Sequence, residues 1–250
     1  MSEPYSRPLN LGHRGARALA PENTLAGMAA AVAAGADGVE FDVQRTADGH
    51  LVLFHDEDLR RIAGVAGRIT DSTLAQLREL DAGSHFGPQF TGQGIPTLDE
   101  TIETLPAGFF LNIEAKRTPY HNDGLEAAVA AAVQHHNLYE RCLVSSFNVA
   151  VLWRLARLDR RIPLGLLYAP DMLPGLSWGW PRHVLRLTAL NPYHEQVTPA
   201  LVRKTHARGQ QVNTWTVNEV EEMQRLIGLG VNAIITDRPD LLHAVQTGVL

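Results

Sequence analysis

Short apolar runs alternate with helical patterns from one end of the 250-residue chain to the other. The first run is followed by Pro21-Glu22-Asn23-Thr24, where Asn23 or Thr24 can cap a helix. Repeated strand–helix units place parallel strands in one sheet and helices outside it. Eight runs are predicted as strands: Leu9–His13, Gly38–Phe54 counted once, Phe109–Lys116, Arg141–Phe147, Ile162–Tyr168, Arg186–Leu190, Gln211–Val217 and Ala233–Thr236.

Eight such units in a chain of this length favour an α/β fold of the (β/α)₈ barrel type. From the pattern alone, a doubly wound open sheet is the alternative, although the chain has no GxGxxG or P-loop sequence to support nucleotide binding on such a sheet. The alternation breaks down between Asp56 and Thr97. We therefore predict one barrel domain over residues 1–250, with a small insertion, residues 56–97, after the second strand.

The charge and the cysteine content limit which binding partners and which cellular compartment are expected for this protein. The chain has 22 Lys and Arg against 27 Asp and Glu, a net charge of −5, which argues against broad nucleic-acid binding. No apolar run approaches the ~18–20 residues of a membrane span, and the first residues lack the pattern of a signal peptide. The single cysteine, Cys142, excludes an intrachain disulfide and suits a reducing compartment. We expect a soluble, cytoplasmic protein without stable membrane insertion, in which Cys142 is a buried structural thiol.

Ionisable pairs stand at the ends of four successive predicted strand segments. They are His13-Arg14, Glu40-Phe41-Asp42, His55-Asp56 and Glu114-Ala115-Lys116. The core of a parallel sheet would otherwise exclude such residues. Because catalytic residues of a barrel gather at the carboxyl ends of its strands, we expect these side chains to meet at one site.

Three of these residues are carboxylates that can share a metal ion. Glu40 and Asp42 are two apart on a strand, so they project from the same face, about 6.6 Å apart along the chain. With Glu114 they form a set that would repel strongly without a compensating cation. Oxygen ligands select a hard ion such as Mg²⁺ or Ca²⁺ rather than zinc, and Mn²⁺ also fits.

The remaining residues of the set suit acid–base chemistry on a phosphate group. His13 and His55 stand outside the metal shell, as suits proton transfer near neutral pH. Arg14 and Lys116 add positive charge beside the metal. A divalent ion, an arginine and a lysine together describe a site for a phosphate.

The ordered motifs resemble those of the glycerophosphodiester phosphodiesterase family. In the first half they are His13-Arg14-Gly15, Pro21-Glu22-Asn23-Thr24, Glu40-Phe41-Asp42, His55-Asp56 and Glu114-Ala115-Lys116. In the rest of the chain, Ile95-Pro96-Thr97-Leu98-Asp99-Glu100, Trp215-Thr216-Val217-Asn218 and the stretch from Gly230 to Pro239 match as well. The resemblance covers nearly the whole chain, and the order and spacing of the motifs make it specific.

The resemblance implies a TIM-type barrel with its insertion after the second strand, and it implies a role for each residue of the site. Glu40, Asp42 and Glu114 would hold one divalent cation. His13 and His55 would be the acid–base pair. The residues implied around the substrate are Arg14 and Lys116 on the phosphate and Trp215 as a wall of the pocket. Glu22 would lie beside the site, as a ligand or, in the role we favour, as a residue that orients its neighbours.

The activity implied is metal-dependent hydrolysis of a glycerophosphodiester, a small-molecule substrate, to glycerol 3-phosphate and an alcohol. By similarity to related phospholipase barrels, His13 is assigned as the first base and His55 as the acid, with a cyclic 1,2-phosphate between the two steps. Two alternatives stay open: a lysophospholipase D or cyclising phosphodiesterase acting on a lipid, and a non-catalytic module that binds a phosphate ligand. The retained histidines and carboxylates speak against the second alternative.

One stretch departs from the family pattern. After His55-Asp56 the family usually continues with an Asp-Arg-Thr-Thr-like stretch, whereas this chain has Leu59-Arg60-Arg61-Ile62-Ala63-Gly64. This stretch opens the insertion, which the resemblance places over the pocket. The sequence therefore predicts the reaction but not the alcohol that is released, nor the oligomeric state.

Overall fold

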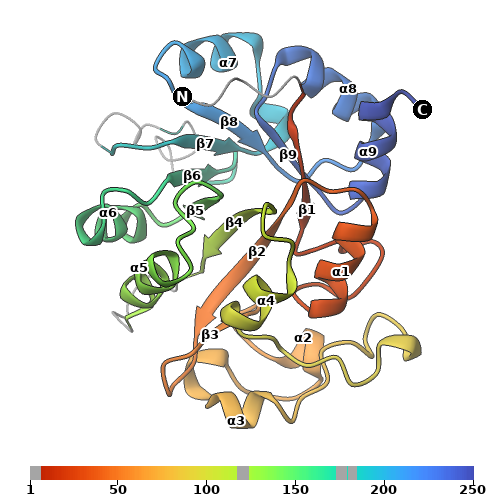
Figure 1. Ribbon diagram of the computed structural model, residues 1–250, viewed down its shortest axis with the longest axis vertical. Helices are drawn as coiled ribbons and strands as arrows, with labels where there is room; N and C mark the ends of the chain where they lie inside the picture. Colours follow the sequence, from red (N-terminus) through yellow and green to blue (C-terminus); the bar gives the residue numbers. More distant parts are fainter. Residues whose placement is uncertain (1–6, 117–123, 173–178, 180–184) are drawn as a thin grey trace.

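Eight parallel strands close into a barrel in the computed structural model, which describes residues 7–116, 124–172, 179 and 185–250 (Figure 1). The closure is made by β1, which pairs with β2 on one side and with β9 on the other. This closed sheet confirms the predicted barrel and excludes the open sheet. The barrel strands are β1 Leu9–His13, β2 Gly38–Arg45, β4 Phe110–Ala115, β5 Cys142–Ser146, β6 Leu164–Tyr168, β7 Ala189–Pro192, β8 Gln211–Thr214 and β9 Ala233–Thr236.

The run predicted as one strand, Gly38–Phe54, is a hairpin. β3, Leu51–Leu53, turns back after Asp48-Gly49 and pairs antiparallel with the end of β2, outside the barrel. Gly49 has a φ of 99°, a left-handed conformation that glycine adopts without steric cost. The hairpin carries His55 back toward the end of the barrel at which β2 finishes.

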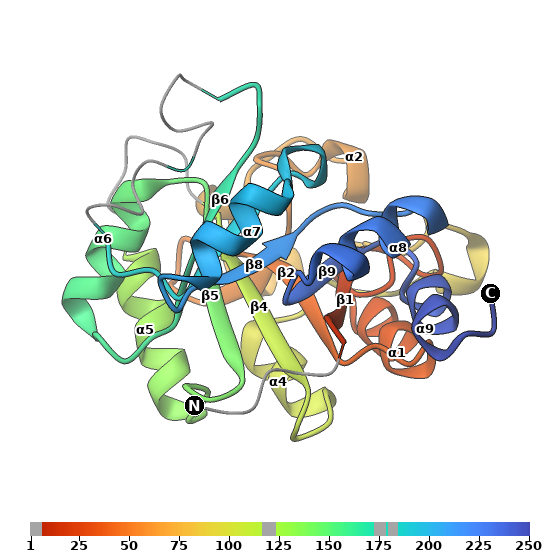
Figure 2. The same ribbon diagram turned by 90° about the horizontal axis from the view of Figure 1, so that it is seen from above.

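Helices cover the outside of the strands, as Figure 2 shows from above. Several begin at a side chain that accepts a backbone N–H, such as Thr24 before α1 and Asn148 before α6. Outside the insertion the helices are α1 Leu25–Ala33, α4 Leu98–Thr104, α5 Leu125–His135, α6 Val149–Leu158, α7 Pro199–His206, α8 Val220–Leu229 and α9 Pro239–Thr247. Among the described residues, none of the helices is both long and apolar enough to cross a membrane.

The main core lies between the strands and this outer layer of helices. It includes Leu111 on β4, Val129 on α5 and Leu152 on α6, each fully buried. Cys142 at the start of β5 belongs to the same cluster, and burial raises the pKa of its thiol to about 12. The prediction that this cysteine is buried is therefore confirmed.

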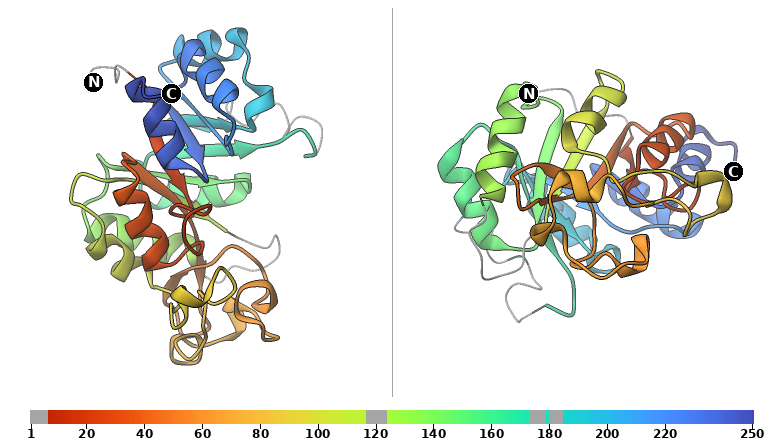
Figure 3. Two further views of the ribbon diagram at one scale, coloured as in Figure 1. Left: turned by 90° about the vertical axis from the view of Figure 1, so that its right-hand side faces the viewer. Right: turned by 90° about the horizontal axis from the view of Figure 1, so that it is seen from below.

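Residues 56–97, predicted as an insertion, form a lobe beside the barrel (Figure 3). The lobe contains short helices around a small apolar cluster that includes Leu59, Ile62 and Leu77. One helix of the lobe, Leu74–Leu77, is only one turn long, and it begins after Thr73, whose side chain makes a capping box with Gln76. The elements of the lobe are α2 Arg60–Ala63, η1 Ile69–Asp71, α3 Leu74–Leu77 and η2 Pro88–Phe90.

Several strand boundaries differ from the sequence prediction, and the largest differences are at β7 and β8. The strand predicted at Arg186–Leu190 is β7, Ala189–Pro192, because pairing with β6 starts with Ala189 beside Gly165. The strand predicted at Gln211–Val217 ends at Thr214, after which Trp215 makes only an isolated bridge to Tyr193. In both cases the apolar run in the sequence predicts that a strand is present. The limits of that strand depend on which residues pair with the neighbouring strands.

Candidate active site

Three carboxylates gather at the carboxyl end of the barrel, on two neighbouring strands. Glu40 and Asp42 lie on β2 and Glu114 lies on β4, where Asp42 pairs in register with Glu114. Each offers an oxygen atom within 4.8 Å of the others, and all three side chains are buried. The structure thus brings together the three residues that were predicted as metal ligands.

This cluster is costly to ionise without a compensating positive charge. Burial raises the pKa of Glu114 to about 7, and burial together with the charge of Asp42 raises the pKa of Glu40 well above its usual range. Burial also opposes ionisation of Asp42, yet Lys116 and Arg14 hold the pKa of that carboxyl below its usual range. Three converging carboxylates without nitrogen or sulfur ligands fit a hard divalent cation such as Mg²⁺ or Ca²⁺.

Two cationic side chains lie beside the carboxylates. Lys116 places Nζ 2.9 Å from Glu114 Oε1 and 3.2 Å from Asp42 Oδ1. Arg14 places Nε 3.2 Å from Asp42 Oδ2, and its backbone N–H donates to Glu40 Oε2. Both cations line the same cavity as Glu40 and Glu114, where they can contact an anionic group.

His13, the last residue of β1, is held through one ring nitrogen. Its Nδ1 lies 2.6 Å from Oδ1 of Asp237, and Asn218 donates a hydrogen bond to the other oxygen of that carboxylate. Burial lowers the pKa of His13, against the opposing effect of Asp237. Because the carboxylate accepts at Nδ1, the neutral ring has its lone pair on Nε2, which lies 3.9 Å from Glu40 Oε2.

His55, just beyond β3, is held in the same way by its neighbour in the chain. Its Nδ1 lies 2.7 Å from Oδ1 of Asp56. Burial lowers the pKa of His55, and the charge of Asp42 opposes that shift. Both predicted acid–base histidines therefore line one cavity, each with Nε2 left for proton exchange.

Glu22 lies behind Arg14 rather than among the carboxylates. Its Oε1 accepts a hydrogen bond of 2.9 Å from Arg14 Nη1, and its Oε2 accepts one of 3.1 Å from Arg17 Nε. Burial opposes ionisation of Glu22, yet hydrogen bonds from Arg61 and the charge of Arg14 lower its pKa to about 2. Glu22 is therefore bonded to Arg14 and is not one of the three clustered carboxylates.

The cavity above these groups has a polar side and an apolar side. Its volume is about 250 Å³. Phe147 and Leu167 line the apolar side, and the ring of Trp215 meets that of Phe147 edge-on with their centres 5.4 Å apart. The Trp215 ring is fixed by a hydrogen bond from Nε1 to the carbonyl oxygen of Asn191. Trp215, predicted as a wall of the substrate pocket, therefore lines this cavity.

A sequence model of the glycerophosphoryl diester phosphodiesterase family matches residues 13–241 of this chain. The chain belongs to this family. Membership makes it a phosphodiesterase enzyme and confirms the resemblance seen in the sequence motifs. The match begins at His13, the first ionisable residue of the site, and includes the other predicted site residues.

Curated relatives and solved structures of the family cover almost the full chain. A glycerophosphodiester phosphodiesterase of Caldanaerobacter subterraneus subsp. tengcongensis is 39% identical over 246 residues, which are 97% of this chain and 99% of that protein. Another from Bacillus altitudinis is 34% identical over 91% of this chain and 94% of its own length. A phosphodiesterase of Oleispira antarctica, solved in complex with the product sn-glycerol-3-phosphate, is 31% identical with a TM-score of 0.83 and covers 96% of this chain and 97% of its own.

Sequence reasoning on this family member missed three residues that fix the site. Asp237 and Asn218 stand in the motifs of the last two strand ends, yet nothing in the sequence paired Asp237 with His13. Asn23 was considered only as a helix cap, whereas its side chain donates to Asp42 Oδ2 and accepts from the backbone N–H of Asp42. The signal available for all three was their place in the family motifs.

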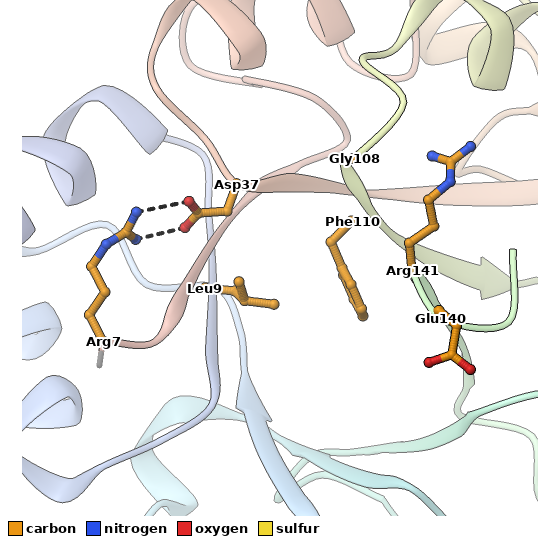
Figure 4. A pocket seen from close by; sticks show the side chains of 7 residues that line it. All are labelled: Arg7, Leu9, Asp37, Gly108, Phe110, Glu140 and Arg141. Carbon is orange, nitrogen blue, oxygen red and sulfur yellow. Dashed lines mark hydrogen bonds and ion pairs between the residues drawn. The ribbon is translucent and has the colours of Figure 1, made fainter. Parts of the chain in front are cut away.

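A second hollow, of about 330 Å³, lies at the opposite end of the barrel (Figure 4). Arg7 and Asp37, just before β1 and β2, form a two-bonded ion pair on one side of it. Phe110 points into the space from β4, and Arg141 lies across from the pair (Figure 4). This end of the phosphodiesterase barrel is separate from the cavity that holds the histidines and carboxylates.

Proposed function

We propose that this enzyme hydrolyses glycerophosphodiesters to glycerol 3-phosphate and an alcohol, with His13 and His55 as its acid–base pair and a divalent cation held by Glu40, Asp42 and Glu114. The observation that carries this proposal is the convergence of two carboxylate-bound histidines, three buried carboxylates and two cations on one cavity. The names of the relatives and the product bound to the Oleispira antarctica enzyme support the choice of substrate.

In the first step the substrate supplies its own nucleophile. The hydroxyl beside the phosphoester oxygen attacks phosphorus, and Nε2 of the neutral His13 takes the hydroxyl proton. His55 enters the step protonated on both ring nitrogens, and it gives its Nε2 proton to the departing alcohol oxygen. One P–O bond forms and one breaks, which yields a cyclic 1,2-phosphate. Holding the reacting hydroxyl and phosphorus within one molecule supplies a large proximity advantage.

In the second step the two histidines exchange roles. His55 takes a proton from water as the water oxygen bonds to phosphorus, and His13 returns its proton to the ring oxygen that leaves. The product is glycerol 3-phosphate, and both histidines regain their starting protonation. Asp237 and Asp56 keep each imidazole in one orientation during both transfers.

The remaining residues bind and neutralise the phosphate. Arg14 and Lys116 contact its oxygens, and Glu22 holds Arg14 in place. A bound divalent cation supplies positive charge for the negative charge that develops on the phosphoryl oxygens. Trp215 and Phe147 bound the side of the cavity that receives the uncharged part of the substrate.

The substrate test uses the purified protein with Mg²⁺, Mn²⁺ or Ca²⁺ on glycerophosphocholine and, separately, on a lysolipid. We expect release of glycerol 3-phosphate and choline from glycerophosphocholine. Turnover of the lysolipid alone would favour the lipid-directed alternative. No turnover of either with any of the three ions, while glycerol 3-phosphate still binds, would favour a binding module.

The route through a cyclic phosphate is tested with an analogue that lacks the glycerol 2-hydroxyl. The analogue keeps the phosphate and the leaving alcohol, so it should bind as a competitive inhibitor. We expect its kcat to fall by several orders of magnitude, because intramolecular attack is worth up to ~7–11 kcal/mol. Equal kcat for the analogue and glycerophosphocholine would replace the substrate hydroxyl with water as the nucleophile.

A further inference from the structure

Arg61, in the first turn of the insertion, joins two carboxylates that belong to different parts of the site. Its Nε and Nη2 donate to Asp56 at 2.6 and 3.0 Å. Its Nη1 and Nη2 donate to Glu22 at 2.9 and 2.7 Å. One planar guanidinium therefore makes a two-bonded contact on each side, which is a geometry that lysine cannot reproduce.

Each of these carboxylates holds a residue of the proposed machinery. Asp56 bonds to Nδ1 of His55, the acid of the first step, and Glu22 bonds to Nη1 of Arg14, which contacts the phosphate. Arg61 is thus connected through Asp56 to the histidine proposed for proton transfer, and through Glu22 to the arginine proposed for phosphate binding. It lies in the stretch Leu59–Gly64, shortly after His55-Asp56 in the sequence.

We propose that Arg61 is a positioning residue, which couples the placement of His55, through Asp56, to that of Arg14, through Glu22. Because this role presupposes the proposed function, its test includes a measurement that does not depend on turnover. The alternative is that Arg61 only ties the insertion to the barrel, as an ordinary surface ion pair would.

The exposure of the partners distinguishes this contact from a typical surface ion pair. The Arg61 side chain is 44% exposed, and an isolated pair at such a position contributes little to stability. Glu22, however, is only 5% exposed and carries Arg14 and Arg17 as well. Loss of Arg61 therefore changes the orientation of groups in the site more than it changes the free energy of unfolding.

The kinetic test compares Arg61→Ala and Arg61→Lys with Arg60→Ala, an exposed arginine of the same helical turn. We expect Arg61→Ala to lower kcat by about 10- to 100-fold, the usual effect of removing a residue that orients a functional one. Arg61→Lys should lower kcat nearly as much, since lysine keeps the positive charge but lacks the planar guanidinium that contacts both carboxylates. Arg60→Ala should leave kcat unchanged, and all three should unfold at temperatures close to the wild type.

Two further measurements separate positioning from simple anchoring. Added guanidinium ion, at concentrations too low to denature, should restore part of the kcat of Arg61→Ala and none of that of Arg61→Lys. In a His55→Ala background, Arg61→Ala should cause a smaller additional loss than it causes in the wild type, because one of the two residues through which it acts is already gone. Full additivity of the two losses, or no rescue, would assign Arg61 to anchoring alone.

The third measurement is the NMR signal of the hydrogen-bonded imidazole N–H protons. The wild type should give one such signal for His55 on Asp56 and one for His13 on Asp237. Arg61→Ala should broaden or lose the His55 signal and keep that of His13, and Arg60→Ala should keep both. If the wild type turns over no glycerophosphodiester, the proposed function fails while this signal still decides on Arg61; an unchanged His55 signal would overturn the inference.

Discussion

At the scale of single residues, His13 and His55 reach the same chemical state with different partners. Each bonds through Nδ1 to a carboxylate, Asp237 or Asp56, and each has its pKa lowered by burial. Burial therefore favours the neutral form of each ring, in which Nε2 can accept a proton. The proposed first step uses the form in which His13 is neutral and His55 carries a second proton, on Nε2. Such a pair can work only as a coupled unit, in which one ring carries the proton that the other does not.

This state predicts the effect of removing each ring and the shape of the pH profile. His13→Ala and His55→Ala should each lower kcat by about 10²–10⁴-fold without unfolding the protein. Because His13 must be neutral to accept a proton and its pKa lies below the ordinary 6.5, the rising limb of kcat/KM should have its midpoint below that pH. The falling limb should report loss of the proton that His55 donates. The profile is measured at two metal concentrations, since a midpoint that shifts with the metal concentration reports titration of the carboxylates. A rising limb with its midpoint above pH 7 at both concentrations would contradict the assignment of His13.

Asp237 offers a separate test of how His13 is oriented. Asp237→Asn keeps the shape but can present an N–H to Nδ1, which favours the wrong tautomer of the ring. We expect kcat to fall by at least about 10-fold with little change in KM. Asp240→Asn, nearby at the start of α9 and paired with Arg238, is the matched control and should retain full activity. Equal kinetics of the two variants would show that His13 needs no carboxylate.

At the scale of elements, the alternation along β2 and its pairing with β4 build the metal site. Residues two apart on a strand share a face, which places Glu40 with Asp42, and parallel register adds Glu114 beside Asp42. These are regular properties of strands, so the cluster could be predicted from the sequence. The four-bonded contact of Arg61 could not, because it depends on how an irregular segment folds back over the barrel.

The raised pKa values of the carboxylates predict that metal competes with protons. Burial raises the pKa of Glu114 to about 7, so below that pH its proton must leave before a cation binds. Metal should therefore raise the unfolding temperature, by the equivalent of about 2.7 kcal/mol at 100 times Kd, and less as the pH falls. Calorimetry in buffers of different ionisation enthalpy should show proton release on binding.

The controls for this prediction are variants of single carboxylates. Glu40→Gln, Asp42→Asn and Glu114→Gln should each lose most of the thermal shift, and chelation with EDTA should abolish wild-type turnover. Glu103→Gln, on the exposed side of α4, should behave as the wild type does. A chelated enzyme with full turnover would remove the cation from the proposed function.

At the scale of the whole molecule, closure of the barrel joins residues that lie far apart in the sequence. His13 and Asp237 are 224 positions apart, and they meet because β1 pairs with β9. The alternation of strands and helices was enough to predict the barrel, and the strand ends were enough to predict its histidines, carboxylates and cations. The partners of these residues depend on closure and on side-chain packing, which periodicity does not encode.

Closure also places two groups of residues at opposite ends of the barrel. The candidate active site lies at the carboxyl ends of the strands, and an ion-pair cluster lies at their amino ends. At the amino end, Asp37 accepts two hydrogen bonds from Arg7 and one from the backbone N–H of Asn10, as Figure 4 shows for the ion pair. Arg7 also donates to Gln246 on α9, so this cluster ties the first strand to the last helix. Because the candidate site lies at the other end of the barrel, we expect these contacts to contribute to stability rather than to the reaction.

We therefore expect Asp37→Ala to destabilise the enzyme while leaving its chemistry intact. Loss of the carboxylate leaves the backbone N–H of Asn10 without its acceptor and Arg7 without its ion pair, which should lower the free energy of unfolding by about 1–3 kcal/mol. The unfolding temperature should fall by about 2–4 °C for each kcal/mol. Below that temperature, kcat and KM should match those of the wild type, in contrast to Asp42→Asn. Glu103→Ala is the control for loss of an exposed carboxylate, and a fall in kcat for Asp37→Ala at full folding would mean that the two ends of the barrel are coupled.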